Sequence, residues 1–176
     1  EAGTGVGKSF AYLVPAIKWC ETNNERVVIS TATINLQQQL VEKDIPLILR
    51  LLEGRGGTKN KVKSVLVKGR GNYLCLRRLH DLMEDNSLFQ EDDSSLQAIY
   101  DWSNSTSTGS KSDLSFVPDS ALWGSVCSES DSCMGLRCFY RDRCFVLKLK
   151  KEAASANILV VNHHLLFSDL SMRMNG

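Results

Sequence analysis

The sequence lacks the features that would place it in a membrane, in the secretory pathway or in a repeat architecture. No run of about 20 consecutive apolar residues is present, so no segment matches a membrane-spanning helix. No basic leader followed by an apolar stretch opens the chain, and no segment repeats at a fixed period. We therefore expect a soluble cytoplasmic protein without a membrane partner.

A short-spaced cysteine pair of the kind C-x2-C is also missing, although the chain has six cysteines. Because no secretory leader accompanies them, they favour metal or cluster ligation over a disulfide framework. Zinc sites commonly use C-x2-C pairs, so their absence weighs against zinc. Reduced cysteines without any metal remain an alternative.

Net charge is almost balanced, at +1 over 176 residues, but the charges are segregated. Residues 50–80 hold nine basic residues and one acidic residue, residues 81–131 hold eleven acidic residues and one lysine, and residues 132–151 are basic again. This alternation is typical of a protein with an anionic partner along part of its surface. Solvated faces around an acidic insert would explain it equally well.

The first nine residues, EAGTGVGKS, indicate a phosphate-binding loop. Alternating glycines let successive N–H groups point into one concavity, and the following helix directs its positive end at the phosphates. The lysine can reach the β- and γ-phosphates and the serine hydroxyl can bind Mg²⁺. The strict pattern has glycine where this chain has Ala2, and a preceding strand is missing, so the chain looks truncated. The predicted ATP and Mg²⁺ site comprises Gly3, Thr4, Gly5, Val6, Gly7, Lys8 and Ser9, with Lys8 and Ser9 as the catalytic residues.

Strand-like and helix-like segments alternate along the chain. β-branched runs predict buried strands at 26–31, 63–67 and 157–161, and apolar periodicity predicts helices at 10–20, 34–44, 73–83 and 145–154, with Pro46 disturbing the end of the second helix. Such alternation predicts an α/β fold with a parallel sheet. The adjacent histidines His163 and His164 are interpreted as a strand-to-helix junction.

The stretch 73–151 is predicted to be an insertion between two parts of the sheet domain, 1–72 and 152–176. Its segment from about 84 to 120 is rich in Ser, Asp and Asn, so we expect a flexible acidic region with one short helix near 95–102. We expect residues 103–110 to be mobile, and removal of residues 106–110 to be nearly neutral.

Three cysteines, Cys133, Cys138 and Cys144, form a tight triplet that needs a fourth thiolate to complete a zinc or iron–sulfur site. Cys75 and Cys127 both remain candidates by position. Cys127 closes a shorter loop, whereas Cys75 would tie both ends of a weakly apolar insertion to one point. Cys20 lies in an apolar helical context and is interpreted as a core residue.

Taken together, EAGTGVGKS, STATINLQQQL, VKGRGNYLC, C-x4-C-x5-C and ANILVVNHHLLFSDL resemble the DinG branch of the DinG/XPD iron–sulfur helicases of superfamily two. The resemblance covers the chain except for the acidic segment. It implies a RecA-like first motor domain and an ATP-dependent DNA helicase that moves 5′ to 3′ in DNA repair or replication. It also implies a [4Fe–4S] cluster held by Cys75, Cys133, Cys138 and Cys144.

The resemblance further implies that DNA is the partner and that parts of the helicase lie outside these residues. Single-stranded and forked DNA would be bound, with Thr31 and Thr33 of helicase motif Ia and with Arg70 and Tyr73 as candidate contacts. Phe139 and Tyr140 are further candidates for base stacking. The D-E-A-H box and the second motor domain of such helicases are absent from these 176 residues, so we expect the chain to be inactive alone and to need the remainder of the protein.

Two other functions fit the residues. One is a different P-loop enzyme, such as a nucleotide kinase, with a zinc-binding insert. The other is a nucleic-acid-binding module whose phosphate loop no longer supports catalysis. A coloured purified protein with DNA-stimulated hydrolysis would count against the kinase, and nucleotide affinity that vanishes in Lys8→Ala would count against the binding module; iron and sulfide content is the most useful single observation.

Overall fold

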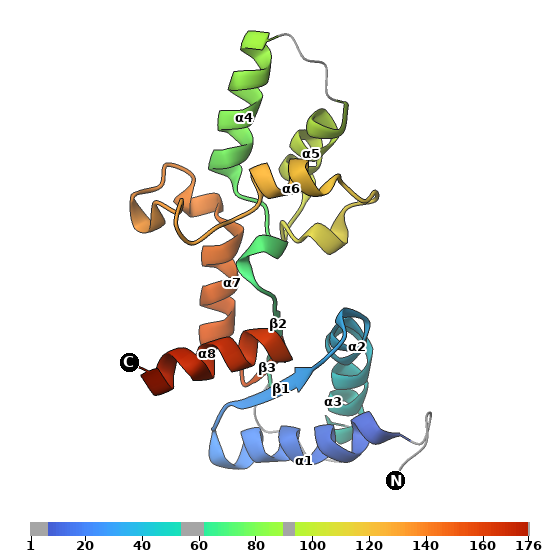
Figure 1. Ribbon diagram of the computed structural model, residues 1–176. Helices are drawn as coiled ribbons and strands as arrows, with labels where there is room; N and C mark the ends of the chain where they lie inside the picture. Colours follow the sequence, from blue (N-terminus) through green and yellow to red (C-terminus); the bar gives the residue numbers. More distant parts are fainter. Residues whose placement is uncertain (1–6, 54–61, 90–93, 176) are drawn as a thin grey trace. The chain divides into compact units, whose positions relative to one another are not determined.

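The computed structural model describes residues 7–53, 62–89 and 94–175 (Figure 1). The chain divides into two compact units, residues 1–68 with 152–176 and residues 69–151. The sequence predicted an insertion at residues 73–151, and the second unit begins four residues earlier, at residue 69. No helix among the described residues combines the length and the apolar character needed to cross a membrane.

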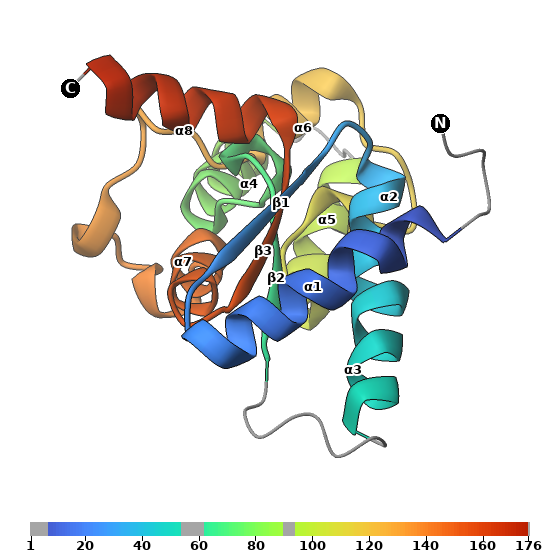
Figure 2. The same cartoon turned by 90° about the horizontal axis from the view of Figure 1, so that it is seen from below.

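The first unit is an α/β domain with a parallel sheet, as the alternating pattern predicted. Its strands lie in the order β1-β3-β2 and both strand pairs are parallel. Figure 2 shows α1 and α3 on one side of the sheet and α8 on the other. The elements are α1 (Lys8–Asn23), β1 (Val27–Thr31), α2 (Ile34–Gln39), a π-helical turn (Leu40–Asp44), α3 (Ile45–Glu53), β2 (Ser64–Val67), β3 (Ile158–Asn162) and α8 (His163–Asn175).

The strand that comes last in the chain occupies the middle of the sheet. Leu159 of β3 is in register with Val28 of β1 and with Val65 of β2. Ile158 and Val160 are fully buried, as expected for a central strand covered on both faces. Helix α1 contributes Leu13, Ile17 and Cys20 to this core, spaced so that they lie on one helical face.

The helix predicted at 34–44 is distorted before Pro46, but the helical segment does not end there. The helical segment does not end near residue 44 but continues through the π-helical turn into α3, where Pro46 is the second residue. Proline is tolerated in the first turn of a helix, and the π turn changes the hydrogen-bond ladder just before it.

The second unit is built from helices and single 3₁₀ turns around its own apolar core. Leu79, Ile99 and Val126 are fully buried at its centre, and Trp123 and Phe145 pack with them. The elements are 3₁₀ turns at Arg70–Asn72, Lys111–Asp113, Gly135–Arg137 and Arg141–Arg143, with helices α4 (Leu76–Phe89), α5 (Ser94–Ser105), α6 (Ser120–Val126) and α7 (Phe145–Ala154), of which α7 continues into the first unit.

The expectation of a flexible segment from about 84 to 120 is corrected for its described part; residues 90–93 lie outside the described residues. Helix α5 buries Leu96 and Ile99, and the turn after it is held by hydrogen bonds. The Gly109 carbonyl accepts from the Leu74 N–H at 2.9 Å, and the Ser107 carbonyl accepts from Lys148 Nζ at 2.8 Å. Sparse apolar residues at helical spacing therefore order a segment whose average composition is polar.

Candidate functional site

The start of α1 carries the described part of the predicted phosphate loop. Gly7 adopts a left-handed conformation with φ of 79°, and Lys8 and Ser9 begin the helix directly after it. The Ala11 N–H donates to the Gly7 carbonyl at 3.2 Å, closing the first helical turn. A glycine turn into a helix N-terminus is an arrangement suited to an anion. The other predicted loop residues, Gly3, Thr4, Gly5 and Val6, lie outside the described residues.

The predicted motif Ia follows the carboxyl end of β1. The Thr31 side chain is 5% exposed, and its hydroxyl donates to the Thr33 carbonyl at 3.2 Å. The Thr33 hydroxyl in turn accepts from the Leu36 N–H at 3.4 Å and caps α2. Both threonine hydroxyls thus shape the turn, and Thr33 is the exposed one of the two.

The paired histidines lie where β3 passes into α8. His163 Nδ1 and Ser30 Oγ are 2.6 Å apart, which links the ends of β3 and β1. The Asn162 side chain accepts from the Leu165 N–H at 2.6 Å and caps α8. The local contacts of this segment are those of a strand-to-helix junction.

In the second unit, a cavity of about 260 Å³ brings together the four cysteines predicted to bind a cluster. Cys75 precedes α4, Cys133 and Cys138 flank the 3₁₀ turn at Gly135–Arg137, and Cys144 precedes α7. Most of the cavity wall is apolar, from Leu74, Leu76, Met134, Leu136, Tyr140, Val146 and Leu147, and its basic members are Arg70, Arg77 and Lys150.

The remaining two cysteines make contacts of ordinary buried thiols. Cys127 is 8% exposed, and its thiol donates to the Gly124 carbonyl at 3.6 Å. The Cys20 thiol donates to the Asn157 carbonyl at 3.5 Å, within the first unit. Burial raises the pKa of both thiols, so both favour the protonated form.

Cys133 has the opposite electrostatic environment. The backbone N–H of Gly135 and the guanidinium of Arg70 lower the pKa of its thiol. Arg70 Nη2 lies 3.8 Å from Cys133 Sγ. A thiolate is the form that binds metals, and this environment stabilises it.

Four cysteines line the cavity. Within the described residues, no group of three or more His, Cys, Asp or Glu side chains is arranged to hold a single metal ion. A tetrahedral zinc site needs four thiolates at about 2.3 Å from one centre. The described side chains therefore do not form a tetrahedral zinc site.

The aromatic side chains predicted to stack on DNA bases differ in their exposure to solvent. Tyr73 is 5% exposed and packs in the core, so its ring is not available to a base in this conformation. Phe139 is 92% exposed, and Tyr140 stacks on His80 with ring centroids 4.9 Å apart.

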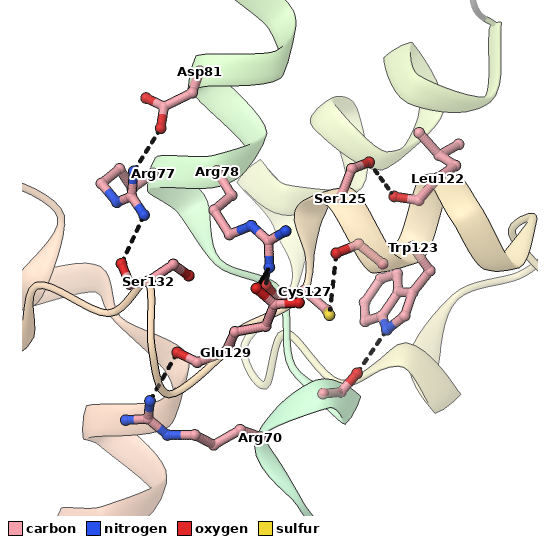
Figure 3. Close-up of polar contacts among 12 residues, drawn as sticks. Arg70, Arg77, Arg78, Asp81, Leu122, Trp123, Ser125, Cys127, Glu129 and Ser132 are labelled. Carbon is pink, nitrogen blue, oxygen red and sulfur yellow. Dashed lines mark hydrogen bonds and ion pairs between the residues drawn. The ribbon is translucent and has the colours of Figure 1, made fainter.

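Arg77 and Arg78 were not candidates from the sequence. They lie on α4 and contact the segment that leads to Cys133, together with Arg70 (Figure 3). Two adjacent arginines in a basic stretch carry no sequence signal for this contact, which only the tertiary structure shows.

Curated proteins with names of helicases are homologous to the chain over nearly its whole length. ATP-dependent DNA helicase YoaA of Escherichia coli K12 is 39% identical over 179 residues, covering 100% of this chain and 26% of the relative. YoaA of Haemophilus influenzae is 38% identical, with 100% and 26% covered, and ATP-dependent helicase DinG of Mycobacterium tuberculosis is 35% identical, with 96% and 27% covered. The chain thus spans about a quarter of the length of these relatives. No protein-family model matches it.

Proposed function

We propose that this chain, a homologue of the YoaA and DinG helicases, is part of an ATP-dependent DNA helicase that moves 5′ to 3′ on single-stranded DNA in the cytoplasm. The observation that carries the proposal is that one chain combines a phosphate-loop helix with a cavity lined by four cysteines. The parallel sheet and this order of motifs support a RecA-like first motor domain with an inserted iron–sulfur subdomain.

The start of α1 would bind ATP. Gly7 has a positive φ directly before the helix, so N–H groups at the helix start would be available to the phosphates, and Lys8 would supply a charge for the β- and γ-phosphates. Ser9 would hold Mg²⁺, which when bound neutralises charge on the phosphates. These residues bind and orient the nucleotide, and the rest of the longer protein would position the attacking water.

The cavity would hold a [4Fe–4S] cluster through Cys75, Cys133, Cys138 and Cys144, with zinc as the less favoured occupant. The donor set fits, because four thiols and a mostly apolar wall surround a space of about 260 Å³. Arg70 and the Gly135 N–H favour the thiolate of Cys133. A bound cluster would supply a cross-link between the start of α4 and the start of α7.

Single-stranded and forked DNA would be the partner. Thr33 is an exposed residue of the motif Ia turn, and Phe139 is an exposed aromatic ring near Arg137 and Arg141 in sequence. Exposed aromatics beside basic residues are the usual means of holding single strands. We propose Thr31 and Arg70 as supporting residues of these contacts, and the burial of Tyr73 argues against base stacking there.

The test uses the full-length protein purified without oxygen. We expect iron and sulfide in equal amounts, a visible absorption band, and ATP hydrolysis that rises with single-stranded DNA. Lys8→Ala should remove ATP turnover while iron content and thermal unfolding stay unchanged, because Lys8 is exposed and contributes nothing to the core. Turnover within a few-fold of the parent would refute the phosphate-loop assignment, and zinc in place of iron would refute the cluster.

A further inference from the structure

The segment that joins α6 to Cys133 receives little help from apolar packing. Its start is held by the core, where the Ser128 N–H donates to the Tyr73 carbonyl at 2.8 Å. Residues 129–132 are exposed and form no helix or strand. The contacts that hold residues 129–132 are therefore mainly polar ones, and they contribute to the position of Cys133.

Three arginines provide such contacts, and each donates to a different backbone carbonyl of the segment (Figure 3). Backbone carbonyls are fixed points of the chain, so three such bonds define its path. The contacts are Arg78 Nη1 to Cys127 O at 2.8 Å, Arg70 Nη1 to Glu129 O at 3.0 Å and Arg77 Nη2 to Ser132 O at 2.9 Å.

The two arginines of α4 each also form an ion pair with a carboxylate. Arg77 Nη1 pairs with Asp81 Oδ2 at 2.7 Å, one turn along the helix, and Arg78 Nη1 pairs with Glu129 Oε2 at 2.8 Å. The arginine side chains are only 26% and 19% exposed, but the Asp81 and Glu129 side chains are 55% and 51% exposed, so solvent screens the ion pairs and the bonds to backbone carbonyls carry more of the positioning. A guanidinium presents its donors in a rigid fork and can serve a carboxylate and a carbonyl together, whereas a lysine ammonium is a single point.

Helix α4 also begins directly after Cys75, another residue on the cavity. One helix therefore carries Cys75 at its start and, within its first turn, the arginines that hold the segment before Cys133. This helix therefore connects the backbone next to Cys75 with the backbone segment that leads to Cys133.

We propose that Arg77 and Arg78 are positioning residues of the cysteine cavity, which fix the segment 127–133 so that Cys133 faces the other thiols. The inference rests on the proposed cluster site. It assigns these arginines a task that neither the phosphate loop nor a DNA contact requires.

The test compares Arg77→Lys, Arg78→Lys and Asp81→Asn in the full-length protein, since these changes keep side-chain size and the first two keep charge. The control is Arg173→Lys on α8, where Arg173 pairs with Asp169 at the same spacing in the other unit. We expect iron loss to a chelator to become roughly tenfold faster in both arginine variants, because hydrogen bonds from charged groups are lost. Asp81→Asn should have a smaller effect in the same direction, and the control none.

A second readout does not need the cluster. Amide hydrogen exchange at Ser128 and Cys133, whose N–H groups donate to the carbonyls of Tyr73 and Ser130, should quicken in Arg77→Lys and Arg78→Lys, while exchange in the core of α5 stays at the parent rate. Parent-like exchange and parent-like iron loss in both variants would overturn the inference. If the parent binds no iron, the cluster proposal fails, and faster exchange in the variants would still support positioning of the segment.

Discussion

Replacement of Gly109 by alanine tests the structure most directly, because it concerns a turn that composition alone predicts to be mobile. Gly109 has φ of 62°, and its carbonyl accepts from the Leu74 N–H. A Cβ built at this position would lie 2.2 Å from Phe145 Cδ2 and 2.3 Å from Phe145 Cγ. Phe145 is 8% exposed and belongs to the core of the second unit, so its ring has little room to withdraw.

Two costs add at this position. A left-handed conformation costs a non-glycine residue about 1–2 kcal/mol, and an extra carbon in a packed core costs about 1–3 kcal/mol. The expected loss in the free energy of unfolding is therefore about 2–5 kcal/mol. A typical domain has only about 5–15 kcal/mol in total, so the loss is large enough to measure.

The assay is urea unfolding of the chain followed by circular dichroism, with Gly135→Ala as the matched control. Gly135 has φ of 56°, close to that of Gly109, but a Cβ there meets nothing within 4 Å. The control therefore measures the backbone cost alone, and the difference between the two variants measures the contact with Phe145. Equal destabilisation of Gly109→Ala and Gly135→Ala would show that the turn does not pack on Phe145 and that the ordered structure assigned to residues 106–110 is incorrect.

The remaining predictions concern the cluster, DNA and pH. Serine variants of the four cavity cysteines should each lose iron, whereas Cys127→Ser and Cys20→Ser should keep it; iron retained in Cys75→Ser but lost in Cys127→Ser would reverse the choice of the fourth ligand. Binding of single-stranded DNA should weaken steeply as salt rises, because counterion release dominates phosphate contacts, and a flat salt dependence would contradict a role for the basic segments. Asp119 caps α6, and the N–H groups of Leu122 and Ala121 hold the pKa of its carboxyl below the ordinary value. Its contribution to stability is present above the ordinary aspartate pKa and is lost as pH falls through the lower folded pKa, so urea midpoints of Asp119→Ala and the parent should converge in acid.

The local elements of the first unit could be predicted from the sequence because their apolar residues are contiguous or periodic. The β-branched runs around Val28, Val65 and Val160 each form a strand, with boundaries shifted by about one residue from those predicted. The order of the strands could not be predicted, since β3 follows the long second unit in the chain and only sheet pairing places it between the other two.

The acidic segment shows where composition misleads. Its average composition is polar, yet Leu96 and Ile99, which lie one helical turn apart, are buried on α5. The spacing of these two apolar residues indicates an ordered helix better than the many serines and aspartates around them indicate disorder. Burial depends on which residues lie on one face of a helix and not on the average composition of the segment.

The cysteines show most clearly which features the sequence predicts and which features depend on the tertiary structure. The spacing of Cys133, Cys138 and Cys144 predicted that they form a group, because short connections allow the three thiols to reach one point. The tertiary structure alone decided that Cys75 lines the same cavity while Cys127 is turned into the core, and that Arg77 and Arg78 contact the segment 127–133. Contacts between residues some 50 positions apart depend on how helices pack, and no local pattern of residue types encodes that packing.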